Sequence, residues 1–149
     1  MRAMTTVHSW EHFSLEELPG LAQKLAEALP MTGVVAVHGP MGVGKTTLIR
    51  ALLKAWEVKE HAASPTFGLV HHHHVTRNGS LAEVRHMDLY RLADEEEAER
   101  SGIADMLHEP VLTLVEWAER IPGLMPDDAW MVRLIPLDGG GRSCILSRL

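Results

Sequence analysis

The chain has 149 residues, of which 46% are hydrophobic and 23% charged, and its formal net charge is −6. This size predicts a single domain over residues 1–149 that buries roughly 70% of its unfolded surface without disulfides or metals. The negative charge excludes a general attraction for nucleic acids or anionic membranes, so any role in nucleic-acid metabolism is expected to run through a partner protein.

Cysteine content and the N-terminal segment indicate a compartment. The single cysteine, Cys144, cannot form an internal disulfide, which suits a reducing environment. Residues 1–12 lack an apolar core of signal-peptide length, and no segment approaches the length of a membrane span. We therefore expect a cytoplasmic protein with no membrane partner.

The first predicted elements are an edge strand at residues 5–13 and an amphipathic helix. Ser14 and Glu17 have the form of a capping box, in which each side chain bonds the other residue's backbone N–H. Apolar residues then recur at helical spacing up to Leu29. Because Pro19 fits only the first turn of a helix, the helix is expected to start there, after one looser turn, and to close before Pro30.

Residues 39–47, Gly-Pro-Met-Gly-Val-Gly-Lys-Thr-Thr, carry the most informative pattern in the chain. They fit the P-loop pattern G-x-x-x-x-G-K-[ST], follow a β-branched apolar run at 34–37 and precede a helical pattern at 47–56. A strand, glycine-rich turn and helix in this order aim backbone N–H groups at one point, which forms a site for nucleotide phosphates. The correct flanks on both sides disfavour a chance glycine-rich turn.

This pattern predicts the contacts with a nucleotide, taken to be ATP with Mg²⁺. Lys45 is expected to reach the β- and γ-phosphates, and the Thr46 hydroxyl to bind Mg²⁺. The predicted nucleotide-binding residues are Gly39, Met41, Gly42, Val43, Gly44, Lys45, Thr46 and Thr47.

A Ser-Pro-Thr-Phe segment at residues 64–67 follows the P-loop helix. In nucleotide switches, a threonine in this region uses its hydroxyl to sense Mg²⁺ or the γ-phosphate. The residues alone support equally well a plain turn in which Pro65 is the turn residue and Thr66 starts a strand.

Two hairpins and a short helix are predicted in the rest of the chain. Residues 67–76 and 81–87 read as strands joined at Asn78-Gly79, a strong hairpin signal. Asp94 and Glu97 cap an acidic helix that Gly102 ends. Two further segments, 129–137 and 142–149, alternate around Asp-Gly-Gly-Gly and predict a C-terminal hairpin.

Residues 111–115, Val-Leu-Thr-Leu-Val, form a short, largely apolar run without charges, which is typical of a strand in the middle of a sheet. Together the elements predict an α/β protein with the three-layer P-loop NTPase fold. Its sheet is expected to be mixed, mostly parallel, with antiparallel hairpins.

Two acids end predicted strands beyond the P-loop, Asp88 and Glu116. Catalytic groups in open α/β sheets lie at the carboxyl ends of strands, beside the phosphate loop. A single acid in such a place is usually a cap, but two favour a metal or water role. We expect Asp88 to bind Mg²⁺ and Glu116 to be either a metal-associated ligand or a water-positioning base.

Four segments together resemble one family, the small bacterial ATPases of tRNA threonylcarbamoyladenosine biosynthesis called TsaE or YjeE. The family signature runs G-x-x-G-x-G-K-T-T, S-P-T-[FY], H-x-D-x-Y-R-L and V-E-W. The chain carries these motifs in that order at residues 39–47, 64–67, 86–92 and 115–117, and the resemblance spans roughly residues 9–135. Pro40-Met41 replaces the commoner acidic–apolar pair of the loop.

The resemblance implies an ATPase that joins the acyltransferase subunit TsaD and its non-catalytic paralogue TsaB. The acyltransferase modifies adenosine 37 of tRNAs, and ATP hydrolysis by the TsaE-like subunit is needed for repeated turnover. Contact with tRNA is then indirect. A catalytic role is expected for Lys45 from the P-loop pattern. The resemblance assigns catalytic roles to Glu116 and to Thr66, the latter as a switch residue, and metal roles to Thr46, Asp88 and Glu116. It marks His86, Tyr90, Arg91 and Trp117 as site or interface residues, for which core packing or a surface ion pair is the ordinary alternative.

Four consecutive histidines, 71–74, lie inside a predicted strand. His71 and His73 share one face, which leaves a two-histidine metal site open, although no third ligand is evident. A solvent-facing, variable hairpin is the favoured interpretation.

Two rival functions share the P-loop. A small-molecule kinase usually needs an arginine-rich lid over the γ-phosphate, whereas residues 94–99 are acidic. A non-catalytic nucleotide sensor would use Asp88 and Glu116 only to hold the ligand. Since no built-in arginine finger is evident, the isolated chain is expected to be a weak ATPase that partner proteins stimulate.

Overall fold

A computed structural model of the chain describes residues 3–59 and 65–149. Ser64 of the Ser-Pro-Thr-Phe segment lies outside these ranges. Within them the strands are β1 (Thr5–Phe13), β2 (Val34–His38), β3 (Val70–Arg77), β4 (Ser80–Asp88), β5 (Leu112–Glu116), β6 (Trp130–Pro136) and β7 (Arg142–Arg148). The helices are α1 (Leu18–Ala28), α2 (Lys45–Ala55), α3 (Glu95–Ser101), α4 (Ile103–Met106) and the short 3₁₀ turn η1 (Ala118–Arg120).

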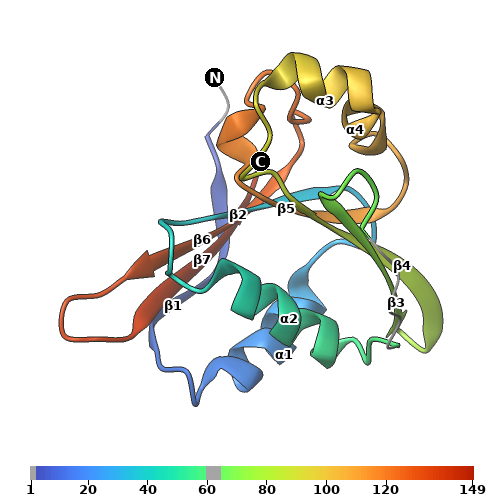
Figure 1. Ribbon diagram of the computed structural model, residues 1–149. Coiled ribbons are helices and arrows are strands. Elements are labelled where there is room, and N and C mark those ends of the chain that lie inside the picture. Colours follow the sequence, from blue (N-terminus) through green and yellow to red (C-terminus); the bar gives the residue numbers. More distant parts are fainter. Residues whose placement is uncertain (1–2, 60–64) are drawn as a thin grey trace.

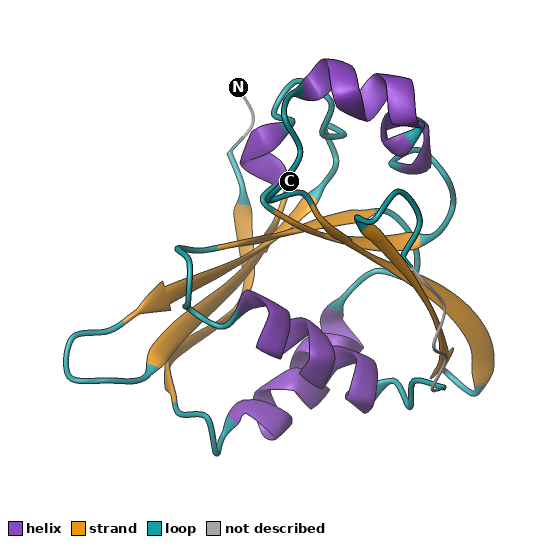
Figure 2. Cartoon of the chain, viewed as in Figure 1, coloured by secondary structure: helices purple, strands orange, loops and turns teal. Residues whose placement is uncertain are grey.

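One sheet runs through the molecule in the order β1-β7-β6-β2-β5-β4-β3. Its four central strands, β6-β2-β5-β4, are parallel, and the pairs at both edges are antiparallel. Helices α1 and α2 cover one face, while α3 and α4 lie on the other (Figure 1). The purple helices of Figure 2 therefore enclose the orange sheet from both sides. The predicted α/β fold with a mixed sheet in three layers is confirmed.

Each face of the sheet has its own apolar core. The first core packs α1 and α2 against the sheet through buried residues such as Leu25, Leu48 and Leu52. The second packs α3 and α4 through Leu89, Ile103 and Ile121. Strands β2 and β5 contribute to both cores because both of their faces are covered, and this explains why their sequences are largely apolar.

Local signals explain where α1 and α3 begin. Ser14 and Glu17 make the reciprocal capping-box bonds, but they close a turn, and α1 starts after it with Pro19 in the first turn. Asp94 accepts a hydrogen bond from the backbone N–H of Glu97 at 2.9 Å and caps α3 as predicted. Gly102 ends α3 at a φ of 90°.

The β3–β4 hairpin forms around Asn78-Gly79, where both residues have positive φ as a type I′ turn requires. Strand β3 begins at Val70 and not at residue 67, which corrects the predicted start. The reason is local: Phe67 and Gly68 have φ angles of 56° and 69° and form a turn before the strand. The elements α4 and η1 were not predicted.

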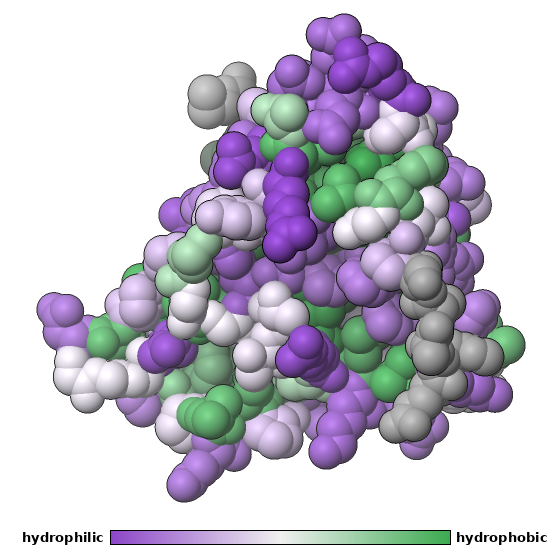
Figure 3. Space-filling model, viewed as in Figure 1, coloured by the Kyte–Doolittle hydropathy of each residue, from purple (hydrophilic) through white to green (hydrophobic). Residues whose placement is uncertain are grey.

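Among the described residues, no helix is both long and apolar enough to cross a bilayer. The apolar areas visible in Figure 3 lie apart from one another, between hydrophilic residues.

Cys144 is buried in the first core, and burial raises the pKa of its thiol to about 12, so the thiol stays protonated and unreactive.

Candidate functional site

The loop between β2 and α2 has the geometry of a phosphate-binding loop. Its close packing requires Gly39, because a Cβ there would lie 2.7 Å from the Val43 side chain and 2.8 Å from the Leu134 carbonyl oxygen. Gly42 and Gly44 have φ angles of 82° and 109°, which favour glycine. Helix α2 begins directly after Gly44, so the backbone N–H groups of its first turn have no partner within the helix and are directed at the loop.

Lys45 lies buried beneath this loop. Its Nζ donates a hydrogen bond to the Gly39 carbonyl at 2.7 Å and lies 3.8 Å from the centre of the Trp117 ring. The ammonium group is thus held by an oxygen and an aromatic face inside the loop. An arriving phosphate would offer this group a stronger, charged partner.

Glu116, the last residue of β5, meets the first turn of α2. Its two carboxylate oxygens each lie 3.0 Å from Oγ1 of Thr46, and Oε2 accepts a 2.6 Å hydrogen bond from Nε2 of His86. Burial alone would raise the pKa of Glu116, but the His86 contact, the Thr46 hydroxyl and the charge of Lys45 together lower it. Glu116 is therefore an ionised, hydrogen-bonded acceptor.

Asp88 ends β4 directly beside Glu116. The two acids are register partners in the parallel β4–β5 pair, and Val37 of β2 is the next partner along. Asp88 also accepts a hydrogen bond from the backbone N–H of Tyr90 at 3.1 Å, so it caps the turn after β4 as well. The carboxyl ends of three parallel strands thus bring both predicted acids to the loop.

These groups line one pocket of about 360 Å³. Thr46, Asp88 and Glu116 face it together with Lys45, and Tyr90 and Trp117 complete its wall. A hydroxyl and two carboxylates are oxygen ligands of the kind that Mg²⁺ prefers, so the residues fit this ion. Tyr90 and Trp117 pack with ring centres 5.1 Å apart, which places two more of the signature residues at the site.

A second pocket of about 390 Å³ borders the same loop. The loop residues Gly42, Val43 and Gly44 border it, and Phe13, Leu18 and Arg142 provide its far wall. The Nε of Arg142 donates a hydrogen bond to the Val43 carbonyl at 2.9 Å, tying β7 to the loop. Sequence reasoning missed Phe13 and Arg142, because no local pattern shows that β1 and β7 lie beside the loop.

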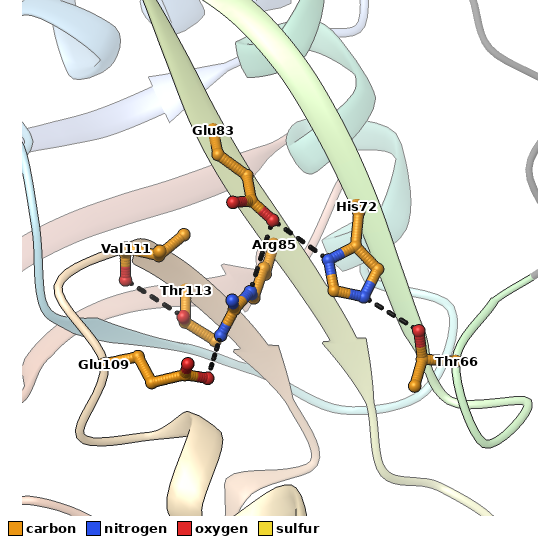
Figure 4. A network of polar contacts seen from close by, with 7 residues as sticks. All are labelled: Thr66, His72, Glu83, Arg85, Glu109, Val111 and Thr113. Carbon is orange, nitrogen blue, oxygen red and sulfur yellow. Dashed lines mark hydrogen bonds and ion pairs between the residues drawn. The ribbon is translucent and has the colours of Figure 1, made fainter.

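Thr66, the predicted switch residue, is engaged elsewhere. Its hydroxyl lies 2.8 Å from Nε2 of His72, and Nδ1 of His72 donates to Glu83 at 3.0 Å. Arg85 connects Glu83 to Glu109, as Figure 4 shows. Thr66 does not line the pocket that holds Lys45 and Glu116, and its role as a switch stays a prediction.

The histidine run is only partly exposed. On one face of β3, the His71 ring stacks on His73 at 6.3 Å and on His86 of the neighbouring strand at 5.8 Å. Burial and the neighbouring histidines lower the pKa values of His71 and His73. Over the described residues, no group of three or more His, Cys, Asp or Glu side chains is arranged to hold a metal ion. The run therefore packs and hydrogen-bonds, which differs from a purely solvent-facing hairpin.

Comparisons with known proteins point to one family. Residues 13–143 match the family model described as "Threonylcarbamoyl adenosine biosynthesis protein TsaE". The tRNA threonylcarbamoyladenosine biosynthesis protein TsaE of Haemophilus influenzae is 35% identical over 123 residues, covering 75% of each chain. Its namesake from Aquifex aeolicus is 40% identical over 109 residues, covering 72% of this chain and 74% of the relative.

A solved structure shares the fold. Bacillus subtilis YdiB superposes with a TM-score of 0.74 at 19% sequence identity, covering 99% of this chain and 88% of its own.

Proposed function

The chain belongs to the TsaE family of tRNA threonylcarbamoyladenosine biosynthesis proteins, and from this premise we propose that it binds ATP with Mg²⁺ in the P-loop pocket and hydrolyses it. The observation that carries the proposal is the convergence of Lys45, Thr46, Asp88 and Glu116 on one pocket beside the glycine-rich loop. A structural role alone would not require a buried ammonium, a hydroxyl and two carboxylates at the same point.

Each of these residues has a task in the proposed reaction. The loop N–H groups and Lys45 bind the β- and γ-phosphates, so Lys45 exchanges the Gly39 carbonyl for phosphate oxygen. Thr46 and Asp88 would hold Mg²⁺, which neutralises phosphate charge when bound, and Glu116 orients the Thr46 hydroxyl. Thr66 would join from the segment before β3 as the residue that senses the γ-phosphate.

We propose that the pocket beside Phe13 and Leu18 binds the nucleoside part of ATP. It borders the loop without being lined by Glu116, and it combines apolar walls with the Arg142 side chain. Apolar walls with a few polar groups are typical of sites that bind a nucleobase. ATP is therefore expected to bind more tightly than inorganic tripolyphosphate.

The proposed activity is weak in the isolated chain. No arginine lines the P-loop pocket in the described part of the chain, so the charge that develops on the γ-phosphate has Lys45 as its only basic side chain there. Partner proteins can supply a further charge or order Thr66. We propose that these partners are the acyltransferase TsaD and its paralogue TsaB, and that hydrolysis resets their complex for further rounds of tRNA modification.

The test is phosphate release from ATP, with and without the acyltransferase pair. We expect slow release that the pair accelerates, and a loss of at least about 100-fold in Lys45→Ala, because one charged partner of the γ-phosphate is removed. Lys54→Ala, at the far end of the same helix, is the matched control. Transfer of phosphate to a metabolite would instead indicate the kinase, and unchanged release in Lys45→Ala would overturn the proposal.

A further inference from the structure

We propose that His86 is a positioning residue for the metal-binding hydroxyl of Thr46, acting through Glu116. The inference rests on the proposed function, because it concerns the same pocket. It assigns to His86 a role distinct from contact with nucleotide or metal: the imidazole fixes the carboxylate, and the carboxylate fixes the hydroxyl.

The first contact in this series is the hydrogen bond between His86 and Glu116. Nε2 of His86 lies 2.6 Å from Oε2 of Glu116, and the exposed fractions of the two side chains are only 11% and 3%. Buried so deeply, the carboxylate has no bulk water to replace a lost donor. Removing the imidazole would therefore leave Glu116 free to rotate or would recruit another donor, such as Lys45.

The second part is the contact between Glu116 and Thr46. Both carboxylate oxygens lie 3.0 Å from Oγ1, so the single hydroxyl hydrogen points toward Glu116. The lone pairs of Oγ1 then face away from the carboxylate, while Thr46 itself lines the pocket. A fixed Glu116 thus keeps the hydroxyl oriented as a metal ligand, and a mobile one would not.

His86 is itself held in place by the β3–β4 hairpin. His71 is its register partner across the two strands, and the rings stack at 5.8 Å with an angle of 28° between their planes. His73 stacks on His71 in turn. Part of the histidine run therefore supports the ring whose Nε2 holds Glu116.

The experiment measures ADP affinity by calorimetry, once with Mg²⁺ and once with a chelator. In His86→Ala, the increase in affinity that Mg²⁺ provides is expected to fall by about 10-fold or more, as for other groups that orient metal ligands, while the chelator value stays unchanged. His86→Gln should restore most of the increase, because its amide nitrogen can take the place of Nε2. His86→Asn is too short to do so and should resemble alanine.

His108→Ala, at an exposed histidine outside this stack, is the control and should retain the full Mg²⁺ effect. His71→Ala provides a second variant at a more exposed position, with a smaller loss in the same direction. The inference is overturned if His86→Ala keeps the Mg²⁺ effect, or if glutamine and asparagine at position 86 behave alike, which would indicate a packing role only. Failure of the wild-type chain to bind ADP at all would instead overturn the proposed function.

Discussion

Two regions of the molecule each link a threonine, a glutamate and a histidine, in different orders. At the ends of the parallel strands, Glu116 lies between Thr46 and His86, whereas in the outer hairpin His72 lies between Thr66 and Glu83. The inner histidine–carboxylate pair is 11% and 3% exposed, and the outer pair is 31% and 33% exposed.

The difference lies in which group is central and how well water reaches it. A buried carboxylate that accepts from two sides has few alternative partners, so it holds both neighbours in fixed positions. An imidazole as exposed as that of His72 can exchange its partners for water at small cost. The inner arrangement suits a site that must be preformed, and the outer one suits a residue that changes partners.

Glu116→Gln is expected to give the largest effect in this comparison. The amide keeps the shape but removes one acceptor oxygen and the negative charge, so turnover of ATP should fall by about 100-fold. ADP affinity without Mg²⁺ should stay close to wild type, because the loop and Lys45 are untouched. Single-turnover hydrolysis and calorimetry would measure the two quantities. Unchanged hydrolysis would contradict a catalytic role for Glu116, whereas a wild-type chain that binds ATP without hydrolysing it would favour the nucleotide sensor.

Thr66→Val tests whether the outer threonine leaves His72 during the reaction. If Thr66 acts as the switch, hydrolysis should fall by about 10-fold while ADP affinity is unchanged, since only the γ-phosphate state needs the hydroxyl. His72→Ala is the companion variant: it removes the resting partner of Thr66 and should not slow hydrolysis. Phosphate release measures both variants. Equal losses of hydrolysis would show that the reaction needs the Thr66–His72 hydrogen bond and not the free Thr66 hydroxyl.

Glu83→Gln should produce the smallest effect, visible mainly in its dependence on pH. Burial alone would raise the pKa of Glu83, but the hydrogen bond from His72 and the charge of Arg85 lower it below the ordinary value of 4.5. A carboxyl group whose pKa is lowered by folding stabilises the protein at pH values above its ordinary pKa. This stabilisation is lost as the pH falls through the pKa of the folded state.

Urea unfolding at several pH values would measure this difference. At neutral pH we expect Glu83→Gln to cost about 0.5 kcal/mol, as for other partly exposed pairs, and the gap to wild type should close in acid. Glu96→Gln, in the well-exposed pair with Arg100, serves as the control and should show little change at any pH. A gap that persists in acid would contradict the assignment to the Glu83 charge.

The sequence predicted the inner region better than the outer one, for a physical reason. Residues 39–47, Asp88 and Glu116 belong to short patterns whose geometry is local, and parallel strands bring their ends together automatically. The sheet, both hairpins and the cap of α3 could also be predicted from the sequence, since turn and cap residues act on backbone groups only a few positions away.

Contacts between distant segments could not be read from such patterns. The bond from His86 to Glu116 depends on the register of β4 against β5, and the Thr66–His72–Glu83 links depend on a turn that Phe67 forms at positive φ. The wall of the second pocket requires β1 and β7 to lie together. Trp117 lines the first pocket from a left-handed conformation that its sequence does not signal.

The pairing of β1 with β7 affects how the protein folds during its synthesis on the ribosome. Residues 5–13 emerge early but find their strand partner only when residues 142–148 have been synthesised. Joining such remote segments is a slow, entropically costly step, so the sheet is completed late. Since Phe13 and Arg142 are register partners in this pair and line the same pocket, the pocket proposed for the nucleoside would be complete only after this final closure.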